Sequence, residues 1–252
     1  MDLTMLKTPW LTYFQQVPGA KLSLVCFPYA GGGGHIFAQW KENLPSNINI
    51  IAVNPPGRGA RMMETPFSQM SPLIADLLPA IKALMNTPVI FFGHSLGAVT
   101  AFEVARALRK QNVPLPKKLL AAGRRAPQVE NDSGAIYHLP DAEFTEEIRK
   151  KKGTPEEVLN NDELMALVLP MLKADFEIAD THQYQDEAPF DFPISYFWGK
   201  EDKPVNRNND DAWAQQTHAE YQHHELNGGH FFLHSEKEQL LSLITKELQS
   251  FL

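Results

Sequence analysis

The sequence is poor in cysteine, in long apolar runs and in positive charge. Its single cysteine, Cys26, lies in an apolar segment, so no disulfide can form within the chain and a reducing, cytoplasmic location is expected. No apolar run approaches the roughly 20 residues that a membrane span needs. Residues 1–7 lack the basic and apolar regions of a signal peptide. The net charge of −7 argues against a nucleic-acid-binding role, which requires a basic face.

Short apolar segments alternate with helix-like segments along most of the 252 residues, of which 43% are hydrophobic and 21% charged. Strands are expected at residues 21–28, 48–53, 89–92, 118–122, 194–198 and 221–226. Helices are expected at residues 36–44, 71–85, 98–110, 210–217 and 236–252. This alternation predicts a single α/β domain over residues 1–252, with a mostly parallel central sheet flanked by helices.

One segment, residues 132–189, has no convincing strand and has helical periodicity at 141–152 and 161–184. We interpret it as a lid over the carboxyl ends of the strands, where ligands bind in open α/β sheets. The alternative is a helical hairpin that only covers the sheet. Met171, Leu172 and Phe176 are candidates for the wall of a substrate channel, although an apolar face is also needed to seal the helix to the sheet.

The pentapeptide 93–97, Gly-His-Ser-Leu-Gly, follows an apolar run and opens a helix-like stretch. A G-x-S-x-G motif in this strand–turn–helix context exposes a nucleophilic serine above the end of a strand. The predicted nucleophile is Ser95. The amide of Leu96 then points at the position where negative charge develops on a substrate carbonyl.

A nucleophilic serine needs a base, and the base needs an acid that orients it; in this fold the acid and then the histidine follow the serine. Asp202 comes after the strand at 194–198, and His230 comes after the strand at 221–226. We therefore expect Asp202 and His230 to complete a triad with Ser95. Glu201 is the nearest competitor for the acid. Weaker histidine candidates, none at metal-ligand spacing, are His35, His94, His138, His182, His223 and His224.

A second oxyanion donor is expected from the loop after the first buried strand, residues 28–34. The amide of Ala30 is favoured and that of Tyr29 is the alternative. The glycines at 31–34 lack the G-x-G-x-x-G spacing and the Lys-Ser/Thr ending of nucleotide-binding loops, so a phosphate cradle is a weak interpretation.

Over nearly its whole length the sequence resembles the type II thioesterases that accompany polyketide synthases and non-ribosomal peptide synthetases. The resemblance rests on Phe27–Gly32, Pro56–Gly59 with Arg61, Gly93–Ala98 with Phe102-Glu103, Leu169–Phe176, Trp198–Asp202 and Gly229–Phe232. Ala122 departs from relatives that often carry serine there. The resemblance implies an α/β-hydrolase fold with a helical lid. It also implies hydrolysis of acyl groups from the phosphopantetheine arm of acyl or peptidyl carrier proteins, with no cofactor and no metal.

A carrier protein of this kind tends to be acidic, so an acidic enzyme needs a local basic patch or an apolar surface to bind it. Candidates are Arg149–Lys152, Arg58 with Arg61, and Arg124–Arg125, although a basic run at a helix end is also favourable without any partner. A monomer is expected. The alternatives that remain are a general carboxylesterase or lipase, an acyltransferase or cyclising thioesterase, and a non-catalytic protein that binds carrier proteins.

Overall fold

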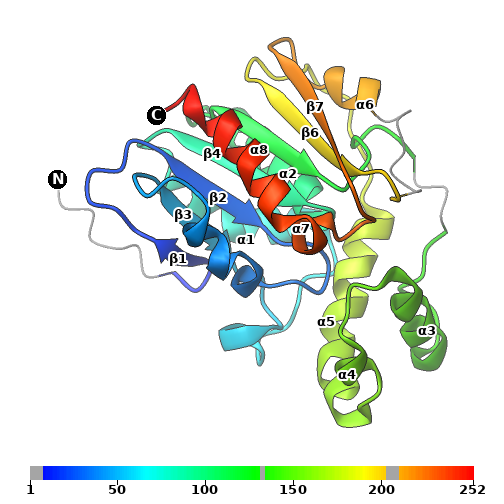
Figure 1. Ribbon diagram of the computed structural model, residues 1–252. Coiled ribbons are helices and arrows are strands. Elements are labelled where there is room, and N and C mark those ends of the chain that lie inside the picture. The colour runs from blue at the N-terminus through cyan, green and yellow to red at the C-terminus, as the bar shows by residue number, and fades with distance from the viewer. Residues whose placement is uncertain (1–7, 131–133, 203–209) are drawn as a thin grey trace.

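Seven strands form one central sheet in the computed structural model, which describes residues 8–130, 134–202 and 210–252 (Figure 1). They are β1 (Leu11–Gln15), β2 (Ser23–Phe27), β3 (Asn49–Val53), β4 (Val89–His94), β5 (Lys118–Ala122), β6 (Ile194–Gly199) and β7 (Tyr221–Leu226). Their order across the sheet is β1-β3-β2-β4-β5-β6-β7. Only β1 runs antiparallel to its neighbour, so the predicted, mostly parallel sheet is confirmed. The predictions for residues 1–7 and for the start of the lid at 132–133 lie outside the described residues.

Strand β1 was missed in the sequence analysis. It pairs with β3 at the edge of the sheet, and only Leu11 in it is buried. An edge strand of this kind lacks the continuous apolar run that marks β2, all of whose residues are buried. Its register with β3 is also interrupted between Tyr13 and Gln15. The pattern that identifies central strands therefore carries no signal here.

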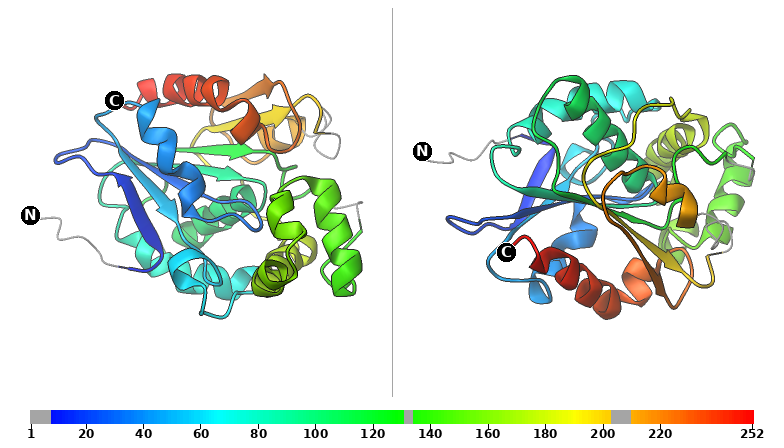
Figure 2. Two further views of the ribbon diagram at one scale, coloured as in Figure 1. Left: turned by 60° about the horizontal axis from the view of Figure 1, so that its bottom comes forward. Right: turned by 90° about the horizontal axis from the view of Figure 1, so that it is seen from above.

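Helices cover both faces of the sheet, as the two views in Figure 2 show. One face carries α1 (Met70–Lys82), α2 (Leu96–Lys110) and α6 (Asp210–Ala214), and the other carries the 3₁₀ helix η1 (Gly34–Glu42), α7 (Phe232–Ser235) and α8 (Lys237–Gln249). The expected helix at 236–252 is α8, and the short α7, which was not expected, precedes it and is separated from it by the non-helical backbone of Glu236. No helix in the described segments is both long and apolar enough to cross a membrane.

The described residues between β5 and β6 contain three helices, not the expected two: α3 (Asp141–Lys151), α4 (Glu156–Leu159) and α5 (Asp162–Thr181). They stand together at one end of the sheet (Figures 1 and 2). They share an apolar cluster of their own, separate from the two clusters on the faces of the sheet. Its buried members are Phe144, Ile148, Leu159, Met165, Met171 and Leu172. We call α3, α4 and α5 the lid.

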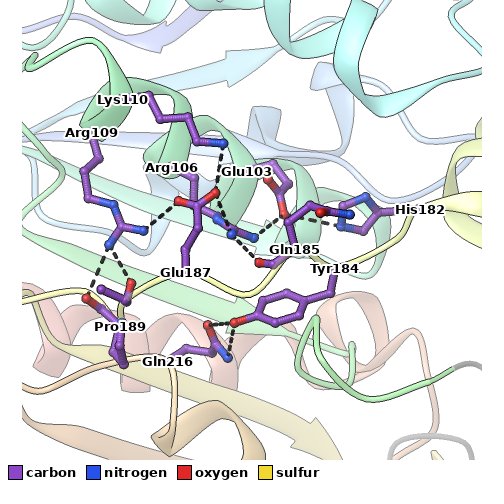
Figure 3. A network of polar contacts seen from close by, with 11 residues as sticks. Glu103, Arg106, Arg109, Lys110, His182, Tyr184, Gln185, Glu187, Pro189 and Gln216 are labelled. Carbon is purple, nitrogen blue, oxygen red and sulfur yellow. Dashed lines mark hydrogen bonds and ion pairs between the residues drawn. The ribbon is translucent and has the colours of Figure 1, made fainter.

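The chain that leaves α5 is tied to the carboxyl-terminal half of α2 by a polar network (Figure 3). Glu187 forms ion pairs with Arg106, Arg109 and Lys110 of α2, at 2.7 to 2.9 Å. Burial alone would raise the pKa of Glu187, but hydrogen bonds from these three cations lower it to about 2. Arg109 also donates to the carbonyl of Ala188 at 2.7 Å. The lid is therefore anchored at its exit to the helix that follows the serine.

Candidate active site

The turn between β4 and α2 places Ser95 in a strained conformation, with φ of 54° and ψ of −117°. The Ser95 amide donates to the carbonyl of Ala122 at the end of β5, at 2.8 Å. A side chain at Gly93 would lie 2.2 Å from the carbonyl oxygen of Gly97, and one at Gly97 would lie 2.1 Å from that of Phe27. Glycine is needed at both positions because backbone passes where a Cβ would stand.

Three of the predicted site residues lie in one hydrogen-bonded chain. His230 Nε2 is 3.1 Å from Ser95 Oγ, and His230 Nδ1 is 2.7 Å from Asp202 Oδ2. A carboxylate only accepts, so Nδ1 carries the proton and Nε2 can accept from the serine hydroxyl. Asp202 follows β6 in a turn closed by its own amide and is 4% exposed, whereas the His230 side chain is 31% exposed. The histidine can thus take a proton from Ser95 while a buried carboxylate orients it.

The other predicted candidates for the base and the acid do not take part in this hydrogen-bonded chain. His224 contacts Glu247 of α8, and His182 lies 3.3 Å from Glu103 of α2. Glu201, the competing acid, is exposed beside the buried Asp202. Burial raises the pKa of Cys26, which sits inside β2, so it is an unreactive thiol. Within the described residues, no group of three or more His, Cys, Asp or Glu is arranged to hold a metal.

The amides of Leu96 and Ala30 form no hydrogen bond within the part of the chain that the structure describes. Leu96 is the first residue of α2, where an amide has no partner within the helix and the helix dipole favours negative charge. Ala30 lies on the loop after β2 and lines the same cavity as Ser95 and His230. This arrangement suits an oxyanion hole, in which the Ala30 amide stays the predicted second donor and that of Tyr29, which lines the same cavity, the alternative.

A cavity of about 460 Å³ extends from Ser95 and His230 to the lid. Leu172 and Phe176 of α5 line it, as expected for residues of a substrate channel. Met171 does not: a side chain at Gly57 would lie 3.3 Å from its Cβ, so Met171 packs against the loop after β3. The prediction for Met171 therefore needs correction, because residues 171 and 172 diverge by the rotation of one helical step.

The basic candidates for a docking surface differ in how far they are exposed. Arg58 is 9% and Arg61 is 6% exposed, and both are hydrogen-bonded inside the protein, so their prediction as docking residues is wrong. Burial lowers the pKa of Arg124 to about 10, and its guanidinium donates to the carbonyl of Ala179. The exposed group is Lys150–Lys152, at the end of α3, and all three residues also line the cavity.

One residue pair of the site was not recognised from the sequence as part of it. Asp175 of α5 binds both Arg58 and the amide of Gly31, next to Ala30. The only signal in the sequence was that both residues belong to segments quoted for the family resemblance, at 56–59 and 169–176. No spacing rule could pair them, since they lie 117 positions apart.

Known proteins resemble this chain over nearly its full length. Residues 23–248 match the family model of the thioesterase domain. The chain is 42% identical over 246 residues to linear gramicidin dehydrogenase LgrE of Brevibacillus parabrevis, covering 96% of this chain and 94% of that protein. It is 37% identical over 240 residues to gramicidin S biosynthesis protein GrsT of Aneurinibacillus migulanus, covering 95% and 94%.

Solved structures match the fold as well as the sequence. The type II thioesterase BorB from the borrelidin biosynthetic cluster superposes with a TM-score of 0.87 at 30% identity. The match covers 95% of this chain and 98% of that one. The chain therefore has the fold of a known type II thioesterase.

Proposed function

This chain belongs to the thioesterase family, and we propose that it hydrolyses acyl thioesters held on the phosphopantetheine arm of carrier proteins in polyketide or non-ribosomal peptide assembly. One observation supports the proposal above all others. The hydrogen-bonded chain from Ser95 through His230 to Asp202 opens into a cavity roofed by the lid. The solved structure of ClbQ, 30% identical to this chain, is of a protein from the colibactin NRPS/PKS pathway, which favours the same substrate class here.

In the first half of the proposed reaction, Ser95 Oγ attacks the thioester carbonyl while His230 Nε2 takes the hydroxyl proton. The carbonyl oxygen becomes an anion, which the amides of Leu96 and Ala30 stabilise by hydrogen bonds. The carbon–sulfur bond then breaks, and the pantetheine sulfur leaves with the proton that His230 returns. Asp202 orients the imidazole and stabilises its cationic form. The product of this half is an acyl ester on Ser95.

In the second half, water gives a proton to His230 as its oxygen attacks the acyl ester. The same two amides stabilise the second tetrahedral intermediate, and His230 protonates Ser95 Oγ as the free acid departs. Every step uses side chains and amides of this chain. The phosphopantetheine arm belongs to the substrate, so the proposal requires no cofactor.

The carrier protein itself is the proposed partner. Lys150–Lys152 lie exposed at the end of α3 and line the cavity that leads to Ser95. A cationic cavity wall is suited to an acidic carrier and to the phosphate at the root of the pantetheine arm, because opposite charges steer encounter and fix orientation. Lys150 is paired with Glu147 at 2.6 Å, which leaves Lys151 and Lys152 as the stronger candidates.

The name of LgrE raises a dehydrogenase as a second candidate function. A dinucleotide site of that kind begins with a G-x-G-x-x-G turn at the start of a helix. Here the glycine loop after β2, Gly31–Gly34, lacks this spacing, and it faces the cavity of Ser95 through Ala30. The geometry therefore favours acyl transfer to water over hydride transfer.

The test is hydrolysis of one acyl group presented in three ways: on a carrier protein, on free pantetheine and as a nitrophenyl ester, with Ser95→Ala as the blank. We expect the highest kcat/KM on the carrier. Equal or faster turnover of the small ester would move the general esterase to first place. An amine or alcohol that captures the acyl group faster than water would identify an acyltransferase or cyclising enzyme. Carrier binding without hydrolysis by the intact protein would identify a binding module.

A further inference from the structure

A single carboxylate on the lid joins two loops of the active site. Asp175 Oδ2 accepts hydrogen bonds from the amide of Gly31 at 2.7 Å and from Arg58 at 2.6 Å, and Oδ1 accepts from Arg58 at 2.8 Å. Arg58 also donates to the carbonyls of Gly32 and Pro56. All five N–H donors of the guanidinium thus have acceptors. Both side chains are less than 10% exposed, so these bonds are shielded from water.

This carboxylate acts on the peptide next to the Ala30 amide. The Ala30 N–H belongs to the peptide group whose carbonyl is that of Tyr29, and that carbonyl accepts from the Gly32 amide at 2.9 Å. Because the described peptides are all trans, the Ala30 N–H points away from its own peptide carbonyl. The direction of the N–H is therefore set by the turn from Tyr29 to Gly32. Asp175 and Arg58 hold that turn at Gly31 and Gly32.

An apolar side chain of the same helix, Leu172, also lies against the loop. Gly31 has a φ of 80°, and a Cβ on it would lie 2.6 Å from Cδ2 of Leu172. Leu172 and Asp175 are three positions apart on α5 and so lie on one face. That face contacts the backbone of the loop with one apolar and one charged side chain. The position of the loop is therefore coupled to the position of α5.

Fold stability alone does not require this arrangement. A buried ion pair is weak evidence for stability, since its desolvation penalty can match the attraction, but it is well suited to fixing one geometry. We propose that Asp175 is a positioning residue: from the lid it orients the Ala30 amide, so that stabilisation of the oxyanion depends on the seating of α5. This inference rests on the proposed function, in which Ala30 supplies one of two oxyanion donors.

The test separates positioning from stability with two variants. Asp175→Asn keeps the shape but loses the charge, and the double variant Arg58→Met with Asp175→Leu replaces the pair by apolar side chains of similar size. We expect kcat to fall by roughly 10- to 100-fold in both, less than the roughly 10²–10³ typical of a fully lost donor, with KM within about twofold. A trifluoromethyl ketone, which binds serine hydrolases as an oxyanion, should lose affinity by the same factor.

The double variant provides the decisive comparison. If it unfolds at the wild-type temperature but remains slow, the pair positions the amide rather than holding the fold. Recovery of wild-type kcat together with wild-type stability would overturn the proposal, as would a change confined to KM. If the double variant fails to fold, Asp175→Asn carries the test, and its kcat is compared with that of the Glu247→Gln control described below. A wild-type kcat in Asp175→Asn would also overturn the proposal.

A control variant breaks a second buried ion pair far from the loop. Lys118 and Glu247 are 5% and 4% exposed and join β5 to α8 on the opposite face of the sheet from α2. Glu247→Gln should lower stability and leave kcat unchanged. The whole series is measured on a pantetheine thioester and on a nitrophenyl ester, since both pass through an oxyanion. A wild-type enzyme that ignores carrier substrates would overturn the proposed function and leave this test intact.

Discussion

His94 donates a hydrogen bond from Nε2 to the main-chain carbonyl of His230, at 2.8 Å. Burial, followed by the proximity of His230, lowers the pKa of His94 well below its ordinary value. His94 is therefore neutral, and it supports the backbone of the triad histidine without competing for its proton. Because His94 immediately precedes Ser95, its hydrogen bond connects the turn that carries the nucleophile to the backbone of the base. The sequence analysis placed His94 only among the weaker histidine candidates.

Replacing His94 by Phe tests this link. The ring is kept, but the donor to the His230 carbonyl is lost, which leaves a buried acceptor unpaired at a cost of about 1–3 kcal/mol. We expect kcat on a small thioester to fall about tenfold as His230 loses its position. His94→Gln, which retains an N–H donor, should lose less. Unchanged kcat in His94→Phe would show that His230 needs no support from this side.

Gly123→Ala should displace the side chain of His94 by a steric clash. Gly123 has a φ of 59°, and a Cβ there would lie 2.7 Å from Cε1 of His94. Gly19, with a φ of 71° and no atom within 4 Å of its Cβ position, is the matched control. Both substitutions strain the backbone by about 1–2 kcal/mol, but only Gly123→Ala should also reduce kcat. Equal stability loss with equal kcat in the two variants would contradict the proposed role of His94.

Glu247 should make stability depend on pH in the acid range. Burial alone would raise the pKa of Glu247, but hydrogen bonds from His224 and Lys118 lower it from 4.5 to about 2. A carboxyl whose pKa is lower in the folded state stabilises the fold above pH 4.5, and this contribution is lost as pH falls towards 2. Urea unfolding of wild type and Glu247→Gln should differ by about 1–2 kcal/mol at pH 6. The difference should shrink steadily from pH 4.5 to pH 2.5, whereas a constant difference would show that the charge of Glu247 contributes nothing.

Charge reversal at the lid tests the docking surface. Changing Lys150, Lys151 and Lys152 to Glu should reduce kcat/KM on a carrier protein by tenfold or more, and the loss should lessen as salt screens the charges. Hydrolysis of a nitrophenyl ester should change by less than twofold. The matched control reverses three exposed lysines remote from the cavity, Lys21, Lys41 and Lys246. Equal losses of kcat/KM on the carrier protein in the two triple variants would show that the net charge of the chain, and not the position of the lysines, causes the effect.

Local patterns were enough to predict the sheet and to select Ser95, Asp202 and His230 as candidates. Ser95 and Asp202 follow β4 and β6, which are fully buried strands, whereas His230 follows β7, a partly exposed strand at the edge of the sheet. The strand ends of a parallel sheet meet at one edge, so chain order translates directly into proximity. The structure accordingly brings these three side chains together.

Contacts between distant segments could not be predicted in the same way. Arg58 was assigned to the surface because a charged residue usually lies there. Its burial depends on Asp175, which α5 presents from 117 positions away, and no local pattern contains that pairing. The error for Met171 has a similar origin. Its sequence neighbours show that it lies on an apolar helix, but only the packing of α5 on the Gly57 loop determines which apolar surface it meets.

The separate apolar cluster of the lid has a consequence for how this enzyme can evolve. Most of its members, such as Phe144, Ile148 and Leu159, pack against one another and not against the sheet. Mutations there can reshape the roof of the cavity while the two large clusters that hold the sheet remain as they are. The range of acyl groups accepted can therefore drift under selection without loss of the hydrolytic machinery. Asp175 is the exception, because the lid must keep its carboxylate in place against the loop that carries Ala30.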